Sequence, residues 1–239
     1  MKTVIVRGIV INEYEAGESD KRLLILCKTH GRIMAYARGA RKPKSKFMAA
    51  SQIFTYADFV LAEGRGFYSV TQADVIESFY NLRTDYDRLN AAHLAAEICT
   101  KSLQDSINCD ELLLLLIKTF SHLKKESLPS IQIALVFFMR FFLFYGLAPQ
   151  TENCTVCETP FEQIEKLFFC PEGVVCKNYK NNTIAVSKTA VYAINHILMS
   201  DLKEAFLFKI SDEVMLELWR VASLMWNYHF EHPLKTCLV

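Results

Sequence analysis

The stretch Leu23–Arg38 reads LLILCKTHGRIMAYAR, two apolar runs separated by the turn-forming residues Thr29, His30 and Gly31. Short apolar or alternating runs that end at such residues predict β-strands. Runs of this kind lie at Val4–Ile11, Leu23–Lys28, Ile33–Arg38, Phe54–Leu61 and Phe67–Val75. Five strands within about seventy residues predict a small closed barrel, because closure removes the exposed strand edges.

An oligonucleotide-binding (OB) barrel is the natural candidate, and an SH3-like barrel has nearly the same strand count. After Asp85 the apolar period becomes helical. It predicts three helices, in YDRLNAAHLAAEICTKSLQ (86–104), DELLLLLIKTFSHL (110–123) and SIQIALVFFMRFFLFYG (130–146). The first opens at the acidic Asp85 and Asp87, and the third closes at Gly146.

Two more helices are predicted near the end of the chain, at Ser187–Met199 and at Asp212–Glu231 behind the N-cap Ser211. The fold class is therefore α+β, a five-stranded OB barrel followed by a helical domain with a cysteine-rich insert. The predicted domains are residues 1–80 for the barrel, 81–149 and 183–239 for the helical domain, and 150–182 for the insert.

Composition and hydropathy limit the classes of protein to which this chain can belong. Of the 239 residues, 51% are apolar and 22% charged, which excludes a disordered chain. The N-terminal VIVRGIVI is interrupted by Arg7 and lacks a cleavage site for a signal peptide, so we expect a cytoplasmic protein. The longest apolar run, Ile133–Ala148, is short for a membrane span and carries Arg140 at its centre, which predicts a buried helix and no membrane contact.

The segment RGARKPKSK (Arg38–Lys46) holds five cations in nine residues, although the net charge of the chain is only +1. Pro43 prevents a regular strand, so we expect an exposed cationic hairpin that projects between two strands. The five side chains repel one another with no acidic neighbour in the sequence, and a polyanion relieves that repulsion as it binds. The five cations are Arg38, Arg41, Lys42, Lys44 and Lys46.

Other features of the barrel half favour nucleic-acid binding. Residues 1–80 have a net charge of +4 and the remainder −3. Four further cations belong to this module, and aromatic residues are interleaved with them, the mixture that holds single strands. These cations are Arg7, Arg22, Arg32 and Arg65, and the aromatic residues are Tyr36, Phe47, Tyr56, Phe67 and Tyr68. A solvated loop that serves only solubility is the alternative, and several of these rings must fill the barrel core.

Four of the eight cysteines fall within 23 residues, as Cys154-x2-Cys157 and Cys170-x5-Cys176. Two thiolates from a tight knuckle and two from a later turn suit a tetrahedral zinc ion, with Zn–S distances of about 2.3 Å. Four protein ligands leave no open position, so the zinc would be structural. The second pair is loosely spaced, and a degenerate site without metal is the alternative. Cys27, Cys99, Cys109 and Cys237 are isolated, and we expect them to be buried.

Two segments carry a resemblance to a known family. The first, GIVINEYEAGESDKRLLILCKTHGRIMAYARGARKPKSKF (8–47), resembles the opening of the bacterial recombination mediator RecO family: a strand, a GESD turn, a THGR turn and a basic GAR loop in that order. The second, FFLFYGLAPQTENCTVC (141–157), resembles the family's junction of helix and cysteine knuckle, with Leu147 in place of the usual aromatic residue.

The resemblance implies an N-terminal OB fold, a helical domain and a zinc-binding insert, with no catalytic activity. It further implies binding and annealing of single-stranded DNA, contact with duplex DNA, action with the partner RecR, and help to RecA in replacing single-stranded DNA-binding protein during repair. These activities would take place in the cytoplasm, at the nucleoid. The basic segment Arg38–Lys46 falls on the family's basic loop.

The sequence departs from the family pattern at the insert. The family commonly ends it with Gly-Gly and Cys-x2-Cys. Here the turn is EGVV (172–175), Cys176 matches the first cysteine of that pair, and Tyr179 occupies the second position. We therefore expect Cys170 to act as the fourth ligand beside Cys154, Cys157 and Cys176.

Arg140 allows two interpretations. A lone cation on an apolar helix commonly extends its charged end to the surface. The resemblance implies a sharper role, an anion receptor for the acidic, apolar C-terminal tail of single-stranded DNA-binding protein.

Two other classes of function compete with these expectations. The sequence contains no P-loop, no Gly-x-Ser-x-Gly elbow and no His-Glu-x-x-His motif, so we expect no enzyme. A zinc-containing transcription regulator of duplex DNA would need a basic recognition helix, and the sequence predicts none.

Overall fold

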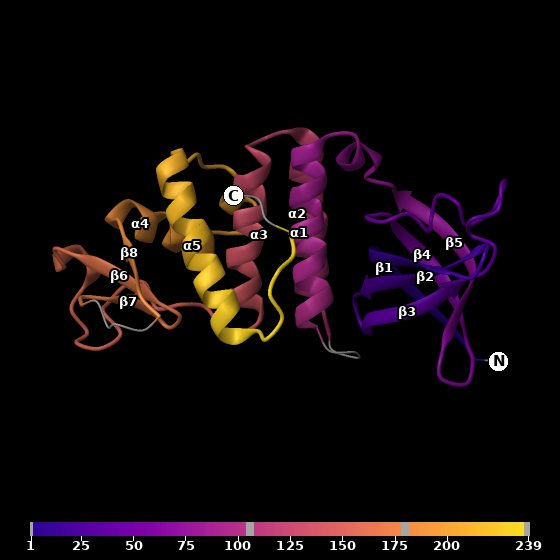
Figure 1. Cartoon of the computed structure of the whole chain (residues 1–239), viewed down its shortest axis with the longest axis horizontal. Coiled ribbons are helices and arrows are strands. Elements are labelled where there is room, and N and C mark those ends of the chain that lie inside the picture. Colours follow the sequence, from indigo (N-terminus) through magenta and orange to yellow (C-terminus); the bar gives the residue numbers. More distant parts are fainter. Residues whose placement is uncertain (1, 104–107, 178–181, 237–239) are drawn as a thin grey trace. The chain divides into compact units, whose positions relative to one another are not determined.

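The structure, a computed structural model, describes residues 2–103, 108–177 and 182–236. The chain divides into two compact units, Met1–Lys124 and Lys125–Val239, each with its own internal contacts. Figure 1 labels the elements of both units. The domain limits predicted at residues 80, 149 and 182 separate strands from helices and from the insert, whereas the two units are defined by contacts. The predicted limits therefore stay a prediction.

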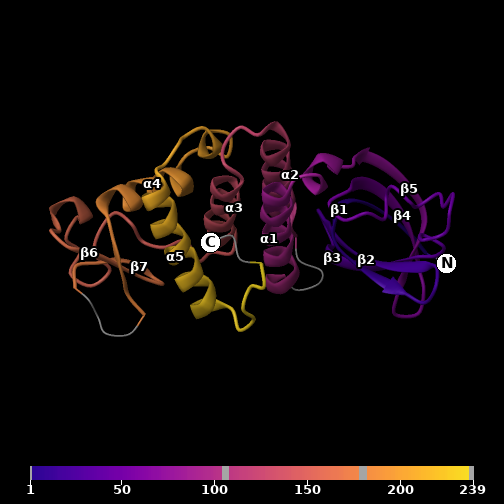
Figure 2. The ribbon, with the colours of Figure 1, turned by 45° about the horizontal axis from the view of Figure 1, so that its top comes forward.

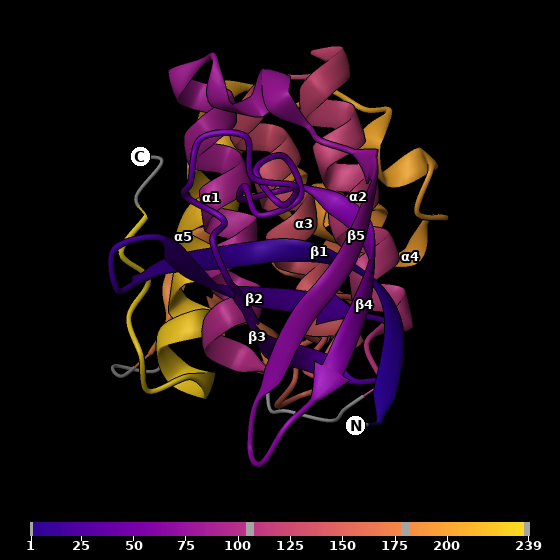
Figure 3. The ribbon, with the colours of Figure 1, turned by 90° about the vertical axis from the view of Figure 1, so that its right-hand side faces the viewer.

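The five predicted strands are all present in the first unit. They are β1 (Thr3–Ala16), β2 (Asp20–Cys27), β3 (Gly31–Ala37), β4 (Tyr56–Glu63) and β5 (Tyr68–Glu77). They pair in the order β1-β2-β3-β5-β4, and β4 pairs again with β1, so the sheet closes into a ring. Only β3 and β5 pair in parallel among these strands. In Figure 3, β1, β2 and β3 run across β4 and β5, as closure of a short sheet requires.

The interior of the ring is filled by alternate side chains of its strands. In β3, Ile33, Ala35 and Ala37 are buried, whereas Met34 lies on the outside. Burial of a large aliphatic or aromatic side chain contributes about 1.5–3 kcal/mol, so this alternation fixes which face of each strand points inward. At Gly8, a Cβ atom would lie only 2.4 Å from the Leu26 carbonyl oxygen, which explains glycine where β1 and β2 approach closely.

The basic segment does not form the projecting hairpin expected from the sequence. Residues 38–54 run through successive turns before β4 begins. Ala40, Phe47 and Ala50 are at most 6% exposed and belong to the core of the ring. Burial of these apolar residues holds the segment against one end of the ring, so its charged residues lie on a packed surface.

Two helices complete the first unit, α1 (Tyr86–Ser102) and α2 (Asp110–Lys125), after the short 3-10 helix η1 (Tyr80–Arg83). The predicted N-terminus of α1 is confirmed, because the Asp85 carboxylate accepts a hydrogen bond of 2.9 Å from the Arg88 amide. The ring of Phe54 lies 5.2 Å from that of Phe120 on α2, centroid to centroid. This buried aromatic contact joins the end of the basic segment to the helices.

The second unit is built around α3 (Ser130–Phe144), with α4 (Lys188–Met199), α5 (Asp212–His229) and the short 3-10 helix η3 (Glu204–Phe206). The prediction that the longest apolar run is a buried helix is confirmed, since Ile133–Met139 are completely buried. The ring of Phe138 lies 5.8 Å from that of Trp226 on α5. In the described part of the chain, no helix has the length and apolarity that crossing a membrane requires.

A small sheet between α3 and α4 was not foreseen from the sequence. Its strands are β6 (Leu167–Cys170), β7 (Gly173–Val175) and β8 (Ile184–Val186), which pair in the order β7-β6-β8, and η2 (Phe161–Gln163) precedes them. Figure 2 shows β6 and β7 beside α4 and α5. This sheet carries the second half of the cysteine-rich insert.

Candidate nucleic-acid interface and metal centre

The basic segment is fastened to the turn between β1 and β2. The Gly39 amide donates a hydrogen bond of 2.7 Å to the Asp20 carboxylate, and the Arg41 amide donates one of 2.9 Å to the Ser19 carbonyl oxygen. The bond from Gly39 lowers the pKa of Asp20, because it favours the charged carboxylate. The start of the segment therefore has a defined position at the end of β3.

The cations of the segment fall into two groups. Arg41 pairs with Glu15 at 3.0 Å, and the Lys46 ammonium donates to the Thr71 carbonyl oxygen at 2.9 Å. These two side chains hold the segment to β1 and β5. Arg38, Lys42 and Lys44 are exposed and present their charge to solvent.

Two acidic residues partly neutralise the positive charge of this surface. Glu15 pairs with Arg41, and the charges of Arg38 and Lys42 help to lower the pKa of Asp20. Both acids lie more than fifteen residues from the segment in sequence. The segment therefore has no acidic neighbour along the chain, as its sequence indicates, but two acidic residues lie beside it in space.

The other predicted cations occupy different environments. Arg7 forms a two-bond ion pair with Asp58 at 2.7 and 2.8 Å, which raises the pKa of Arg7. Arg22 lies over the ring of Tyr14, and Arg32 donates to the Thr100 carbonyl oxygen. Arg65 is exposed between β4 and β5. Arg22 lies on β2 and Arg38 directly follows β3, so these two belong to neighbouring strands, whereas Arg7 faces β4.

The cysteine knuckle is a tight turn. The Cys154 amide donates to the Thr159 carbonyl oxygen at 2.8 Å, and the Glu158 amide donates to the Cys154 carbonyl oxygen at 3.0 Å. Glu158 has a left-handed backbone, with φ of 60°. The Thr155 amide also donates to the Val174 carbonyl oxygen at 2.9 Å, which brings the knuckle to β7 and to Cys176 just beyond it.

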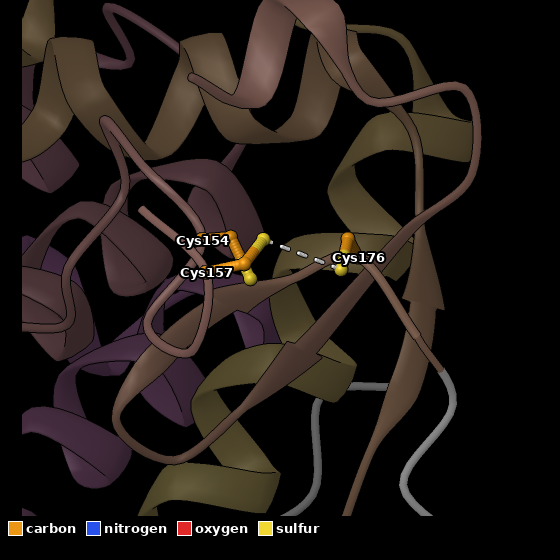
Figure 4. Close-up of side chains that lie close together, drawn as sticks. All are labelled: Cys154, Cys157 and Cys176. Atoms are coloured by element: carbon orange, nitrogen blue, oxygen red, sulfur yellow. Dashed lines mark hydrogen bonds between the residues drawn. The ribbon is translucent and has the colours of Figure 1, made fainter. Parts of the chain in front are cut away.

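The sulfur atoms of Cys154, Cys157 and Cys176 lie within 4.8 Å of one another. Figure 4 shows these three side chains together. The Cys157 and Cys176 sulfurs are 3.6 Å apart. Sulfurs around tetrahedral zinc lie about 3.8 Å apart when each Zn–S distance is about 2.3 Å. This spacing fits a shared metal ion, and it is much longer than a disulfide bond of about 2.05 Å.

The chemistry of the cluster also suits a metal. A hydrogen bond with the Thr159 hydroxyl, 3.2 Å from the Cys157 sulfur, is the largest of the effects that lower the pKa of Cys157 to about 6. Thiolates bind zinc and thiols do not, so a low pKa prepares this ligand. The hydrogen bond with Cys157 raises the pKa of Cys176.

Cys170 lies outside the three-sulfur cluster. Its thiol donates to the Gly173 carbonyl oxygen at 3.3 Å, within the turn between β6 and β7, and burial raises its pKa. The fourth-ligand role predicted for Cys170 therefore has no support in the geometry. Tyr179, which stands where the family has its last cysteine, lies outside the described residues.

Comparison with protein families covers nearly the whole chain. The family model described as Recombination protein O N terminal matches residues 1–79, and the one described as Recombination protein O C terminal matches residues 83–237. The chain belongs to the RecO family. The two matches contain the ring of strands and the cysteine cluster respectively, so both candidate sites lie in RecO sequence.

Individual relatives agree with the family match. A DNA repair protein RecO from Acetivibrio thermocellus is 34% identical over 218 residues, which cover 90% of this chain and 87% of the relative. A DNA repair protein RecO from Alkaliphilus metalliredigens is 31% identical over 207 residues, covering 85% of this chain and 84% of the relative.

In this RecO chain, Arg140 of α3 is half-buried. Its guanidinium donates to the Ser200 carbonyl oxygen at the end of α4, while its buried Nε atom has no partner within the described ranges. Burial lowers the pKa of Arg140, and the charge of Asp201 opposes that shift. The side chain caps the C-terminus of a helix, where cations are favourable.

Sequence analysis missed three residues that build these sites. Asp20 anchors the basic segment, Thr159 contacts the Cys157 sulfur, and Gly173 lets β7 approach the backbone of Gln150. Asp20 stands in the GESD turn and Gly173 in the EGVV turn, so both were visible as turn residues. Their partners lie far from them in the sequence, so their roles could not be predicted.

Proposed function

We propose that this chain acts in DNA repair and recombination by holding single-stranded DNA on the ring of strands β1–β5. The support that matters most is membership of the RecO family across both halves of the chain. The pairing order β1-β2-β3-β5-β4 suits an OB-fold barrel, a common scaffold for single strands. Arg38, Lys42 and Lys44 supply exposed positive charge for phosphates.

The role we propose needs no catalysis. When two complementary strands are held and brought together, base pairing itself supplies the free energy of annealing. We further propose that the chain works in the cytoplasm, at the nucleoid, with RecR and on duplex as well as single-stranded DNA. There it assists RecA in displacing single-stranded DNA-binding protein. The competing role, a zinc-containing transcription regulator, is not favoured by the family match, and strong preference for one duplex sequence would be its mark.

We also propose that Cys154, Cys157 and Cys176 hold a structural zinc ion. The fit rests on the spacing of the three sulfurs and on the low pKa of Cys157. Bound zinc would join the knuckle to the end of β7 and so stabilise the insert. The three sulfurs come from two turns that the ion would cross-link, which is the task of a structural site.

Neutralising the exposed cations tests the DNA-binding role. In the triple variant Arg38→Gln, Lys42→Gln, Lys44→Gln, we expect weaker binding of single-stranded DNA and a shallower salt dependence. Removing one phosphate contact reduces the slope by about 0.7 for single strands, so removing three reduces it by about 2. Fluorescence anisotropy across a salt series measures both quantities. Annealing of strands coated with single-stranded DNA-binding protein should slow in parallel.

Arg41 and Lys46 are left intact in this variant because they hold the segment in place. The control variant Lys166→Gln, Lys177→Gln, Lys203→Gln removes the same charge from exposed positions of the second unit. If both variants changed the salt slope and the annealing rate equally, the basic segment would have no special role.

Arg140 offers a proposed contact for the tail of single-stranded DNA-binding protein. Met199 and Leu207 are 70% and 65% exposed, and Met199 precedes the Ser200 carbonyl group that Arg140 contacts. An apolar tail with acidic residues could contact these side chains and the guanidinium together. Asp201 lies close enough to affect the Arg140 pKa, so the tail must outcompete its charge.

Replacing Arg140 by methionine tests this contact, because methionine keeps much of the apolar stem. We expect affinity for the tail peptide to fall about 10-fold or more, as loss of a charge-assisted hydrogen bond predicts. Calorimetric titration of the peptide into the intact protein measures the change. The control Arg220→Met removes an exposed cation from α5. Unchanged affinity in Arg140→Met would remove Arg140 from the proposal.

A further inference from the structure

A row of aromatic and cationic side chains crosses the outer face of the ring. Tyr14 of β1 is the cross-strand partner of Arg22 of β2, and Arg22 is the partner of Tyr36 of β3. Arg22 lies over the ring of Tyr14, with its guanidinium carbon 5.7 Å from the ring centroid. Tyr36 meets Phe67 edge to face, with centroids 5.9 Å apart.

The row points away from the core. Leu23 and Ala35, the neighbours of Arg22 and Tyr36 along their strands, are fully buried inside the ring. Because side chains alternate along a strand, Arg22 and Tyr36 project outward. Tyr14 is 38% exposed and Phe67 40%. Single exposed apolar residues are ordinary. Here two rings and a guanidinium lie on neighbouring strands, and the ring of Phe67, just before β5, contacts Tyr36.

The row adjoins the basic segment. Arg38 comes two residues after Tyr36, where β3 has ended. Lys46 donates to the carbonyl oxygen of Thr71, two residues beyond Ser69, which is the β5 partner of Tyr36. Figure 3 shows β1, β2 and β3 side by side. Rings bordered by cations form the kind of surface that holds an unpaired strand, with phosphates on the cations and bases on the rings.

We propose that Tyr14, Arg22, Tyr36 and Phe67 bind unpaired bases by stacking. This inference rests on the proposed function and deepens it, since it assigns the recognition of bases to residues outside the basic segment. The planar guanidinium of Arg22 stacks on a base as an aromatic ring does. Because every base has a flat face, the row accepts any sequence, and it requires that the bases be unpaired.

Contacts with Gly64 hold Phe67 in position. The Gly64 amide donates to the Phe67 carbonyl oxygen at 2.8 Å, and a Cβ atom on Gly64 would lie 2.9 Å from the Phe67 ring. The ring rests on the glycine, so the hairpin between β4 and β5 positions Phe67 beside Tyr36. Gly64 is therefore a positioning residue for the row.

Comparing the affinities for DNA strands with and without bases distinguishes binding by stacking from binding by charge. In the intact protein, Tyr36→Ala with Phe67→Ala should weaken binding of a thymine oligonucleotide about 10-fold or more, a loss in the range measured for a single stacked base. Binding of an abasic sugar–phosphate strand of equal length should not change. The salt slope should also stay as in the wild type, because the phosphate contacts remain. The control Tyr86→Ala removes a ring that is 77% exposed on α1.

A substitution that keeps an aromatic ring shows whether the loss of affinity in the double alanine variant comes from the missing ring or from misfolding. Phe67→Trp should retain affinity, and the added indole fluorescence should be quenched by the thymine strand and not by the abasic strand. The inference is overturned if wild-type protein binds both strands equally, or if the double alanine variant loses affinity for both equally. In either case the proposed function stands. If wild-type protein binds neither strand at low salt, the proposed function itself fails.

Discussion

Replacing Gly173 by alanine is expected to destabilise the second unit by about 3–5 kcal/mol, an unusually large effect for one methyl group. Gly173 has φ of 142°, a backbone conformation that alanine rarely adopts. A Cβ atom there would lie 2.0 Å from the Gln150 carbonyl oxygen and 2.7 Å from the Gln150 nitrogen. Neither backbone atom can rotate away as a flexible side chain does.

The strain would reach the cysteine cluster. The Val174 amide donates to the Gln150 carbonyl oxygen, and the Val174 carbonyl oxygen accepts from Thr155 beside Cys154. If β7 moves away from Gln150, Cys176 moves with it and separates from the knuckle. We therefore expect Gly173→Ala to lose zinc binding as well as stability.

Gly146→Ala is the matched control for this substitution. Gly146 also has a positive φ, of 74°, and no atom lies within 4 Å of a Cβ built there. Only the left-handed backbone is penalised, at about 1–2 kcal/mol. Urea denaturation of both variants measures the difference. Equal destabilisation would show that the approach of Gly173 to Gln150 is not the source of the effect.

The local pattern of the sequence predicted most elements of the fold. Short apolar and alternating runs located all five ring strands. The start of the first helix was located at Asp85 and Asp87, and Ser211 was located as a helix N-cap. The order of the strands could not be read in the same way. The parallel pairing of β3 with β5 joins segments separated by the whole basic segment and β4, and no local periodicity records such a pairing.

The small sheet of the insert was missed for a different reason. β7 and β8 have three residues each, too few for an alternating pattern to be recognised. Its strands are positioned by the knuckle and by Gln150, which precede them in the chain. The sequence therefore predicted the cysteines and not the sheet that orients them.

The cysteine cluster shows how far spacing can determine a metal site. Cys154, Cys157 and Cys176 come together, as their spacing suggested, but Cys170 turns its thiol toward Gly173. Spacing along the chain gives the reach of a side chain and not its direction. Likewise, the basic segment was visible as a charge run, whereas its partners Glu15 and Asp20 come from the adjoining ends of β1 and β2.

Removing one cysteine ligand is expected to remove the metal. Purified wild-type protein should hold about one zinc ion per chain, and Cys154→Ser should bind zinc about 100-fold more weakly or worse, because a hydroxyl replaces a thiolate. Cys154 is the right choice because it is 1% exposed and its backbone amide, which donates to the Thr159 carbonyl oxygen, shapes the knuckle in either variant, so serine fits without new contacts. Plasma emission spectrometry measures the metal content.

Cys170→Ala is the control within the same insert, and we expect it to keep its zinc because its sulfur lies outside the cluster. Stability gives a second measurement. A ligand present at 1,000 times its dissociation constant stabilises the folded state by about 4 kcal/mol, so a strong chelator should lower the stability of wild type and Cys170→Ala by this order. It should leave Cys154→Ser almost unchanged. Zinc retained in Cys154→Ser would exclude Cys154, and with it the three-sulfur cluster, as the metal site. Zinc lost in Cys170→Ala would also contradict the proposal, because the ligands would then include a thiol that the fold directs toward Gly173.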